Sequence, residues 1–132
     1  MNIKSVLEGR KRQVSSIRLF DKVDDTIRFF SNTNCKAAVV LDDKQSLCGI
    51  VTEHDLVHCL GERGNAAADD TIDDIMSLDL VVCTPETAIR EAIKLMSQHK
   101  IHHLPVVSEA GHLVGFVDMM EVMVKYIDSM PD

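Results

Sequence analysis

The sequence has no excess of positive charge, no long apolar run and no low-complexity segment. It carries 14 lysines and arginines against 21 aspartates and glutamates, which gives a formal net charge of −7 at pH 7. Affinity for nucleic acid comes largely from basic side chains that neutralise phosphates, so this balance argues against a nucleic-acid partner. No apolar stretch approaches the roughly 18 residues of a membrane-spanning helix, and the N-terminal residues lack the hydrophobic core of a signal peptide. We therefore expect a cytoplasmic protein without a membrane partner.

Familiar catalytic motifs are also missing. The sequence contains no G-x-S-x-G, no H-E-x-x-H and no P-loop, so we do not expect an enzyme. No two of its four cysteines form a C-x-x-C pair, and three of them lie within or beside apolar runs. We interpret them as small, reduced core residues rather than as a disulfide framework.

The chain does contain an internal repeat. Residues 21–60 align with 87–126 without a gap, at a shift of 66 residues. Six of the 40 aligned pairs are identical, and the hydrophobic positions match much more widely. With 132 residues of which 45% are hydrophobic, the chain can form one compact core or two small halves that share one.

Each repeat predicts the same order of elements. Apolar residues at positions i, i+3, i+4 and i+7 from Ile89, and at the same positions from Val23 except for Thr26, indicate an amphipathic helix in each repeat. Two short apolar runs around a turn then predict a hairpin, and a second helix follows. The predicted strands are 14–17, 37–41 and 47–51 in one half and 80–83, 104–107 and 113–117 in the other, with second helices at 53–60 and 119–128.

The predicted fold class is therefore α+β (mixed α/β), with two βαββα repeats packed as a pseudo-two-fold symmetric pair. We place the first domain at 1–62, a linker rich in Gly, Ala and Asp at 63–70, and the second domain at 71–132. The short leaders NIKSVL and TIDDIM match in pattern. A half of about 60 residues is marginally stable alone, so the sheet faces should pack together and leave a cleft at their seam.

The stretch GIVTEHDL, at 49–56, turns from apolar to polar where a strand meets a helix. The hydroxyl of Thr52 can cap the helix, while the negative charge of Asp55 at the third helical position interacts favourably with the N-terminal end of the helix dipole. Asp118 and Glu121 hold the same positions in the second repeat, so capping alone explains both pairs. A second hypothesis is a nucleotide site, because the helix N-terminus offers N–H groups to phosphate and the carboxylate can accept from ribose hydroxyls.

Three stretches in this order, GIVTEHDL, TIDDIMSLDLVVCTPET and MSQHKIHHLPVV, resemble the cystathionine-β-synthase-type (CBS) domain. Two such repeats in tandem look like a CBS pair, or Bateman module. The resemblance implies a non-enzymatic regulatory module that binds an adenosine-containing ligand such as AMP, ADP, ATP, NAD or S-adenosylmethionine and senses energy or cofactor state in signal transduction. It also implies a homodimer of pairs, no required cofactor, and an effector protein that the sequence does not identify.

The resemblance assigns site residues position by position. Asp55 would accept from the ribose, Thr52 would contact ribose or phosphate, Ile50 would line the pocket and Lys36 would lie near the phosphates. The base would lie against the other half. The residues implied there are Ser77, Leu80, Val81, Ile101 and His102.

A second, weaker site is implied at the symmetry-related position. It would use Asp118, Glu121, Val14 and Cys35, with Lys36 and with His102 or His103 on the phosphate side. Asp118 stands where the family has Thr or Ser, and its carboxylate disfavours a nearby phosphate. Glu121 stands where the family has Asp, one methylene shorter. We expect one competent site per chain and a second that is weak, empty or altered in preference.

Two rival interpretations stay open. His99, His102, His103 and His112 suggest a metal site, but neighbouring strand residues point to opposite faces, which argues against one shared ion. The alternative function is a structural dimerisation or partner-docking module without ligand. It is suggested by the apolar positions of the last helix, which are Met119, Met120, Val122, Met123, Tyr126, Ile127 and Met130.

Overall fold

The computed structural model describes residues 1–8 and 14–131 and divides them into two compact units. One unit is Val14–Leu80, which we call the central unit. The other combines the described part of Met1–Gln13 with that of Val81–Asp132, and we call it the terminal unit. Both units are mixtures of helices and strands, as the sequence predicted, and each contains a helix, a β-hairpin and a second helix in that order. The packing of the two repeats on each other stays a prediction.

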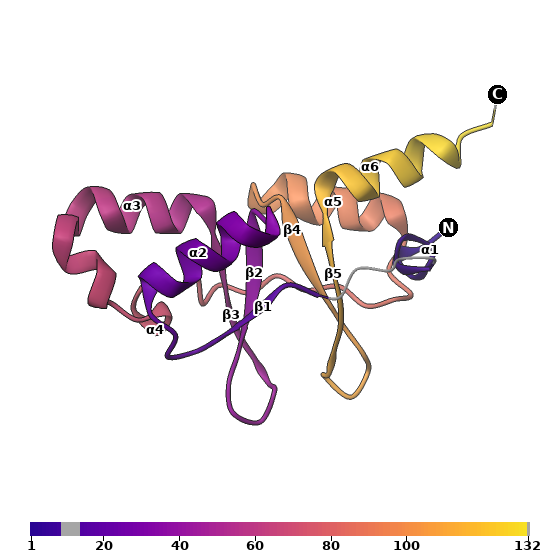
Figure 1. The fold of residues 1–132 in the computed structure, drawn as a ribbon. Helices are drawn as coiled ribbons and strands as arrows, with labels where there is room; N and C mark the ends of the chain where they lie inside the picture. The colour runs from indigo at the N-terminus through magenta and orange to yellow at the C-terminus, as the bar shows by residue number, and fades with distance from the viewer. Residues whose placement is uncertain (9–13, 132) are drawn as a thin grey trace. The chain divides into compact units, whose positions relative to one another are not determined.

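The central unit is built on a three-stranded sheet in the order β1-β2-β3 (Figure 1). The strands β1 and β2 are parallel, and β2 and β3 form an antiparallel hairpin. Two longer helices and two short ones complete the unit. Its elements are β1 (Ser16–Arg18), α2 (Val23–Thr33), β2 (Ala37–Leu41), β3 (Leu47–Thr52), α3 (Glu53–Arg63), the 3-10 helix η1 (Gly64–Asp69) and α4 (Ile72–Ile75).

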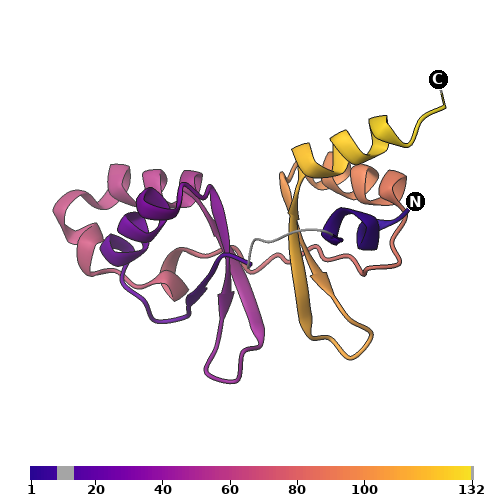
Figure 2. The ribbon, with the colours of Figure 1, turned by 45° about the vertical axis from the view of Figure 1, so that its right-hand side comes forward.

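The terminal unit repeats this plan with a two-stranded sheet, β4-β5. Its helices α5 and α6 lie side by side, and α1 lies close to β5 and α6 (Figure 2). Its elements are α1 (Ile3–Leu7), α5 (Ile89–His99), β4 (His103–Val107), β5 (Leu113–Asp118) and α6 (Met119–Asp128).

Each unit has its own hydrophobic core, formed where the apolar faces of its helices meet its sheet. In the central unit, Val23 and Phe30 of α2 pack with Leu56 of α3 and with Val40 and Val51 of the hairpin. The corresponding core of the terminal unit contains Ile3, Ile89, Met96, Leu104, Val106, Val117 and Val122. The apolar periodicity from Val23 and from Ile89 therefore marked the buried side of α2 and of α5 correctly.

The backbone reproduces the 66-residue repeat in detail. The helices α2 and α5 both end in a left-handed residue, Asn34 and Lys100, each with φ of 54°. Both hairpins carry an irregularity at the same aligned place, between Val40 and Leu41 and between Val106 and Val107. The halves thus share backbone geometry beyond their shared hydrophobic pattern.

The strand predicted at 80–83 was wrong. Only Cys83 pairs there, through a parallel bridge with Val106. The amide of Cys83 donates to the carbonyl of Pro105 at 3.0 Å, and the amide of Val107 donates to the carbonyl of Cys83 at 2.8 Å.

Two prolines explain why this pairing stops after one bridge. In the central unit, the amide of Val39 donates to Ser15 at 3.0 Å and the amide of Leu19 donates to β2 at 3.1 Å, which extends the pairing on both sides. The aligned donors in the other repeat are Pro105 and Pro85, neither of which has an N–H group. Both flanking hydrogen bonds are therefore lost.

The segment 63–70, predicted as a linker, folds onto the central unit as the end of α3 and as η1. Ala67 is fully buried in the core of that unit, and Arg63 forms an ion pair with Asp70. The segment still connects the two repeats in sequence. Its alanines favour helical structure, whereas its glycines and aspartates are typical of a linker and led to that prediction.

The two short leaders each pack in the unit of the other repeat. Ile3 of α1 is buried in the terminal unit, although α1 precedes the first repeat in sequence. Ile72 of α4 is buried in the central unit, although α4 precedes the second repeat. The compact units thus divide the chain differently from the predicted sequence domains 1–62 and 71–132.

Candidate functional site

A reciprocal capping box joins Thr52 and Asp55 where β3 ends and α3 begins. The amide of Thr52 donates to Oδ2 of Asp55 at 2.9 Å, and the amide of Asp55 donates to Oγ1 of Thr52 at 3.3 Å. Oγ1 of Thr52 also lies 3.1 Å from Oδ2 of Asp55. The capping interpretation of this pair is therefore confirmed.

The box leaves one oxygen of Asp55 uncommitted. All the hydrogen bonds of its carboxylate to described residues use Oδ2, so Oδ1 is available to accept from a ligand. Both side chains of the box are half-buried, and they sit at the N-terminus of an 11-residue helix. The hydroxyl of Thr52 is positioned to donate to Asp55, so a phosphate would have to compete for its proton.

Lys36 lies at the same end of the β2–β3 hairpin as the capping box. The register pairs Ala37 with Thr52, and the amide of Glu53 donates to the carbonyl of Lys36 at 3.0 Å. The Lys36 side chain is exposed, and none of the described ion pairs involves it. A cation is thus available one residue before β2, next to Ala37, the residue that pairs with Thr52.

Ser77 lies opposite Ile50. The two residues exchange both backbone hydrogen bonds, at 3.1 Å and 2.8 Å, which holds the segment after α4 against β3. Ile50 is half-buried and Ser77 is exposed. Leu80, the last residue of the central unit, is half-buried. The central unit therefore holds six of the nine residues predicted for the first site.

The other three predicted residues belong to the terminal unit. Val81 and Ile101 are half-buried against its core. The carbonyl of His102 accepts from the amide of Met119 at 2.8 Å, which repeats the contact between Lys36 and Glu53. Ile101 and His102 also line a hollow of about 290 Å³, together with Ile93, Met96, Ser97, Lys100, Met119 and Met123.

A second capping box joins Asp118 and Glu121 at the start of α6. The amide of Glu121 donates to Oδ1 of Asp118 at 2.7 Å, and the amide of Asp118 donates to Oε1 of Glu121 at 3.1 Å. The two repeats thus share the cap but differ in charge, since this box holds two carboxylates and the other holds one. Of the remaining residues predicted for the second site, Val14 and Cys35 belong to the central unit, where both are half-buried.

His103 lies beside this second box, paired with Asp118 across the β4–β5 ladder. Its ring stacks on Phe116 with centroids 5.2 Å apart and planes inclined by 19°. Burial lowers the pKa of His103, and the nearby carboxylate of Asp118 opposes that shift. A neutral imidazole is therefore favoured here, which suits a packing role better than a phosphate contact.

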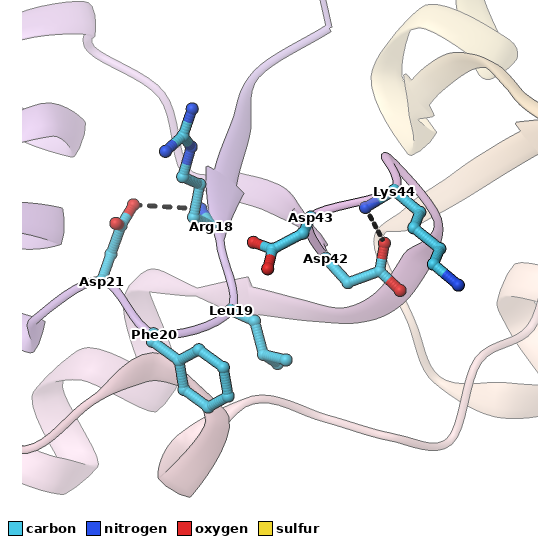
Figure 3. A pocket seen from close by; sticks show the side chains of 7 residues that line it. All are labelled: Arg18, Leu19, Phe20, Asp21, Asp42, Asp43 and Lys44. Atoms are coloured by element: carbon cyan, nitrogen blue, oxygen red, sulfur yellow. Dashed lines mark hydrogen bonds between the residues drawn. The ribbon is translucent and has the colours of Figure 1, made fainter.

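Another hollow in the central unit contains none of the predicted residues. It lies at the turn end of the β2–β3 hairpin, opposite to the end that carries Thr52, and has a volume of about 510 Å³. Figure 3 shows its side chains, with the amide of Lys44 donating to Asp42 and the amide of Arg18 donating to Asp21. Its lining residues are Arg18, Leu19, Phe20, Asp21, Asp42, Asp43 and Lys44. Turn-like composition was the only sequence signal in this region.

Within residues 1–8 and 14–131, no group of three or more histidine, cysteine or acidic side chains is arranged to hold a metal ion. In the same residues no helix has the length and apolar character needed to cross a membrane. Cys59 and Cys83 are buried, and burial raises the pKa of the Cys83 thiol to about 11. That thiol is a packing group with little thiolate character.

Two repeats, each with a helix and a β-hairpin that ends at a capped second helix, define the class of this chain. The chain belongs to the CBS domain family, which matches it twice, at residues 10–62 and 72–128. The resemblance drawn from the sequence is thereby confirmed. A curated relative is the mitochondrial CBS domain-containing protein CBSX3 of Arabidopsis thaliana, 32% identical over 107 residues that cover 78% of this chain and 52% of the relative.

Solved structures share the fold. The CBS-domain protein ATU1752 of Agrobacterium tumefaciens superposes with a TM-score of 0.87 at 23% identity, covering 95% of this chain and 92% of its own. CBSX2, solved in complex with AMP, superposes with a TM-score of 0.82 at 21% identity, covering 96% of both chains. The CBS pair of MJ0100, solved with 5-methylthioadenosine and S-adenosyl-L-methionine, superposes with a TM-score of 0.84 at 18% identity, covering 98% of both chains.

The chain corresponds to only a part of longer relatives. It spans about half the length of CBSX3. It also matches an inosine-5'-monophosphate dehydrogenase of Nitrosopumilus maritimus, at 28% identity over 107 residues, which is 81% of this chain but 21% of that enzyme.

Proposed function

We propose that this chain is a non-enzymatic regulatory module that binds an adenosine-containing ligand at Thr52 and Asp55. The observation that carries the proposal is the Asp55 carboxylate, which closes the capping box with Oδ2 and leaves Oδ1 uncommitted at the N-terminus of α3. A half-buried carboxylate oxygen of this kind accepts hydrogen bonds from hydroxyl groups. One side chain thus serves both the fold and the ligand.

The ligands of related structures indicate which part of the molecule is recognised. CBSX2 was solved with AMP, and MJ0100 with 5-methylthioadenosine and S-adenosyl-L-methionine. These compounds share adenine and a ribose with vicinal hydroxyls, whereas only AMP has a phosphate. Ribose recognition by Asp55 is therefore the common step, and Lys36 adds a preference for AMP, ADP, ATP or NAD through its positive charge. Val81, Ile101 and His102 stay predicted contacts for the base and phosphates.

The test is thermal unfolding with AMP, ADP, ATP, NAD and S-adenosylmethionine in turn. A ligand at 100 times its dissociation constant should stabilise the protein by about 2.7 kcal/mol, which raises the melting temperature by several degrees. Lys36→Ala should weaken the binding of phosphate-containing ligands and leave the binding of S-adenosylmethionine unchanged. The absence of any shift, in folded protein shown to carry no ligand through purification, would contradict the proposal.

A second candidate function is homodimerisation through α6. Met120, Val124 and Ile127 recur at i, i+4 and i+7 on this helix, with 62%, 51% and 61% of their surfaces exposed. Val122 of the same helix is buried, so the exposed row is a separate face. An apolar row of this kind fits a second copy of the chain, in line with the dimer that the family resemblance implies.

Substitution of Val124 by lysine should convert the dimer to a monomer, because it buries a charge without a partner in an apolar contact. Light scattering of the purified protein measures the result as a halved molar mass. Val114→Lys is the matched control, since Val114 is a similarly exposed valine on β5 of the same unit, and it should remain dimeric. A wild-type monomer at high protein concentration would rule this candidate out.

A further inference from the structure

The outer face of α3 carries two histidines and a glutamate in one row. His54, His58 and Glu62 are spaced i, i+4 and i+8, so they lie above one another along the helix. All three are exposed, with 66% of the His58 side chain and 69% of the Glu62 side chain open to solvent. The core of the central unit uses the other side of α3, through Leu56 and Cys59, so packing does not account for the row.

The two imidazole rings are close and aligned. Their centroids are 6.4 Å apart, and their planes are inclined by only 20°. Oε1 of Glu62 lies 3.4 Å from Nε2 of His58. Two protonated imidazoles at this spacing would repel each other, as like charges do at i, i+4 of a helix. Two neutral rings avoid this repulsion, and each can offer a ring nitrogen to a single cation.

We propose that His54 and His58 bind one divalent transition-metal ion of the Zn²⁺, Ni²⁺ and Cu²⁺ class, with water in the remaining coordination positions. Imidazole is a preferred ligand for these ions, and two histidines at i, i+4 on a helix present their nitrogens to one point. This site lies outside the proposed adenosine site, which uses the cap residues Thr52 and Asp55.

Glu62 completes the site as a positioning residue. A histidine that binds a metal through one ring nitrogen commonly donates its other N–H to a carboxylate, which fixes the tautomer and the ring orientation. Glu62 lies close enough to Nε2 of His58, at 3.4 Å, to take this role, which would leave Nδ1 of His58 for the metal.

Two protein ligands make an open, exchangeable site rather than a closed structural one. This agrees with the absence, in the part of the chain that the structure describes, of any group of three or more metal-binding side chains. The remaining four histidines are in the terminal unit, and among them the ring of His103 is packed against Phe116. The proposal therefore predicts that metal binding depends on His54 and His58 and not on the four histidines of the terminal unit.

Isothermal titration calorimetry of the nucleotide-free protein with Ni²⁺, and separately with Zn²⁺, tests the proposal. We expect one equivalent of metal to bind per chain, and this binding to disappear in His54→Ala and in His58→Ala. Glu62→Gln should retain the site with roughly tenfold weaker affinity, as the loss of an outer-shell partner usually does. Circular dichroism checks that each variant is folded.

The decisive control keeps the number of histidines constant. In the double variant His58→Ala, Leu60→His, the second imidazole moves from i+4 to i+6, on another side of the helix, so metal binding should be lost. Unchanged binding in this variant or in His54→Ala would overturn the proposal, as would a wild-type protein that does not bind either ion. Because no nucleotide is present, these results are independent of whether the adenosine site exists.

Discussion

Adenosine-ligand binding should be lost when Asp55 is replaced by alanine, with only a small loss of stability. In the proposed site the substitution removes the acceptor for two ribose hydroxyls, and hydrogen bonds to a charged group contribute about 1.5 to 3 kcal/mol each. We therefore expect affinity to fall roughly 100-fold or more, as measured by calorimetry with the ligand that stabilises the wild type. The lost capping box should lower the free energy of unfolding by only about 1 kcal/mol.

Asp74→Ala is the matched control for this variant. Asp74 closes a capping box with Thr71 at the start of α4, in the same unit and with the same pair of residue types. Its removal costs a cap of the same kind without touching the ligand site. Wild-type affinity in Asp74→Ala together with loss in Asp55→Ala would establish a binding role for Asp55. Equal ligand affinity in the two variants would show that Asp55 only caps the helix and does not bind the ligand.

Gly49→Ala should destabilise the protein by about 3 kcal/mol, the upper part of the range for an overpacked core. A Cβ atom at Gly49 would lie 2.7 Å from Sδ of Met76 and 2.8 Å from the carbonyl oxygen of Ser77. That carbonyl accepts from the amide of Ile50, so the backbone that would have to move is held by a hydrogen bond. Urea unfolding followed by circular dichroism measures the loss.

Gly115→Ala is the control at the aligned position of the other repeat. A Cβ atom there would meet only the end of the Leu7 side chain, with Cδ2 at 2.8 Å and Cδ1 at 3.0 Å. A leucine can change rotamer, whereas a hydrogen-bonded carbonyl cannot, so the expected loss is about 1 kcal/mol. If both variants lost the same stability, backbone clash would not be the reason that glycine occupies Gly49.

Local signals in the sequence predicted most of the fold. The predicted helix 119–128 has the observed bounds of α6, and the predicted strand 37–41 has those of β2. Helical and strand periodicity report which side of an element is buried, and these elements are buried on one side or completely. The cap at Thr52 and Asp55 was also predictable from local sequence, because all its atoms lie within four consecutive residues.

What was missed depends on contacts between residues distant in sequence. The strand expected at 80–83 fails because Pro105, more than 20 residues away, lacks the amide that Val39 supplies in the other repeat. The stacking of His103 on Phe116 needs the β4–β5 register, which a list of histidines does not contain. The row of His54, His58 and Glu62 lies within nine consecutive residues of one helix, so its spacing of i, i+4 and i+8 is visible in the sequence itself.

The exchange of the leaders α1 and α4 bears on how this protein can be divided. The 66-residue repeat and the compact units have different boundaries, so a repeat of the sequence is not the same segment as a unit that folds. A break after Asp70 leaves the first fragment without α4, whose Ile72 fills its core, and leaves the second without α1, whose Ile3 does the same. A break after Leu80 keeps Val14–Leu80 intact, and a permuted chain that begins at Val81 and continues through a new junction into Met1 would restore the other unit. Each repeat therefore depends on the leader of the other for one helix, so neither repeat can complete its core when it is cut out at the repeat boundary.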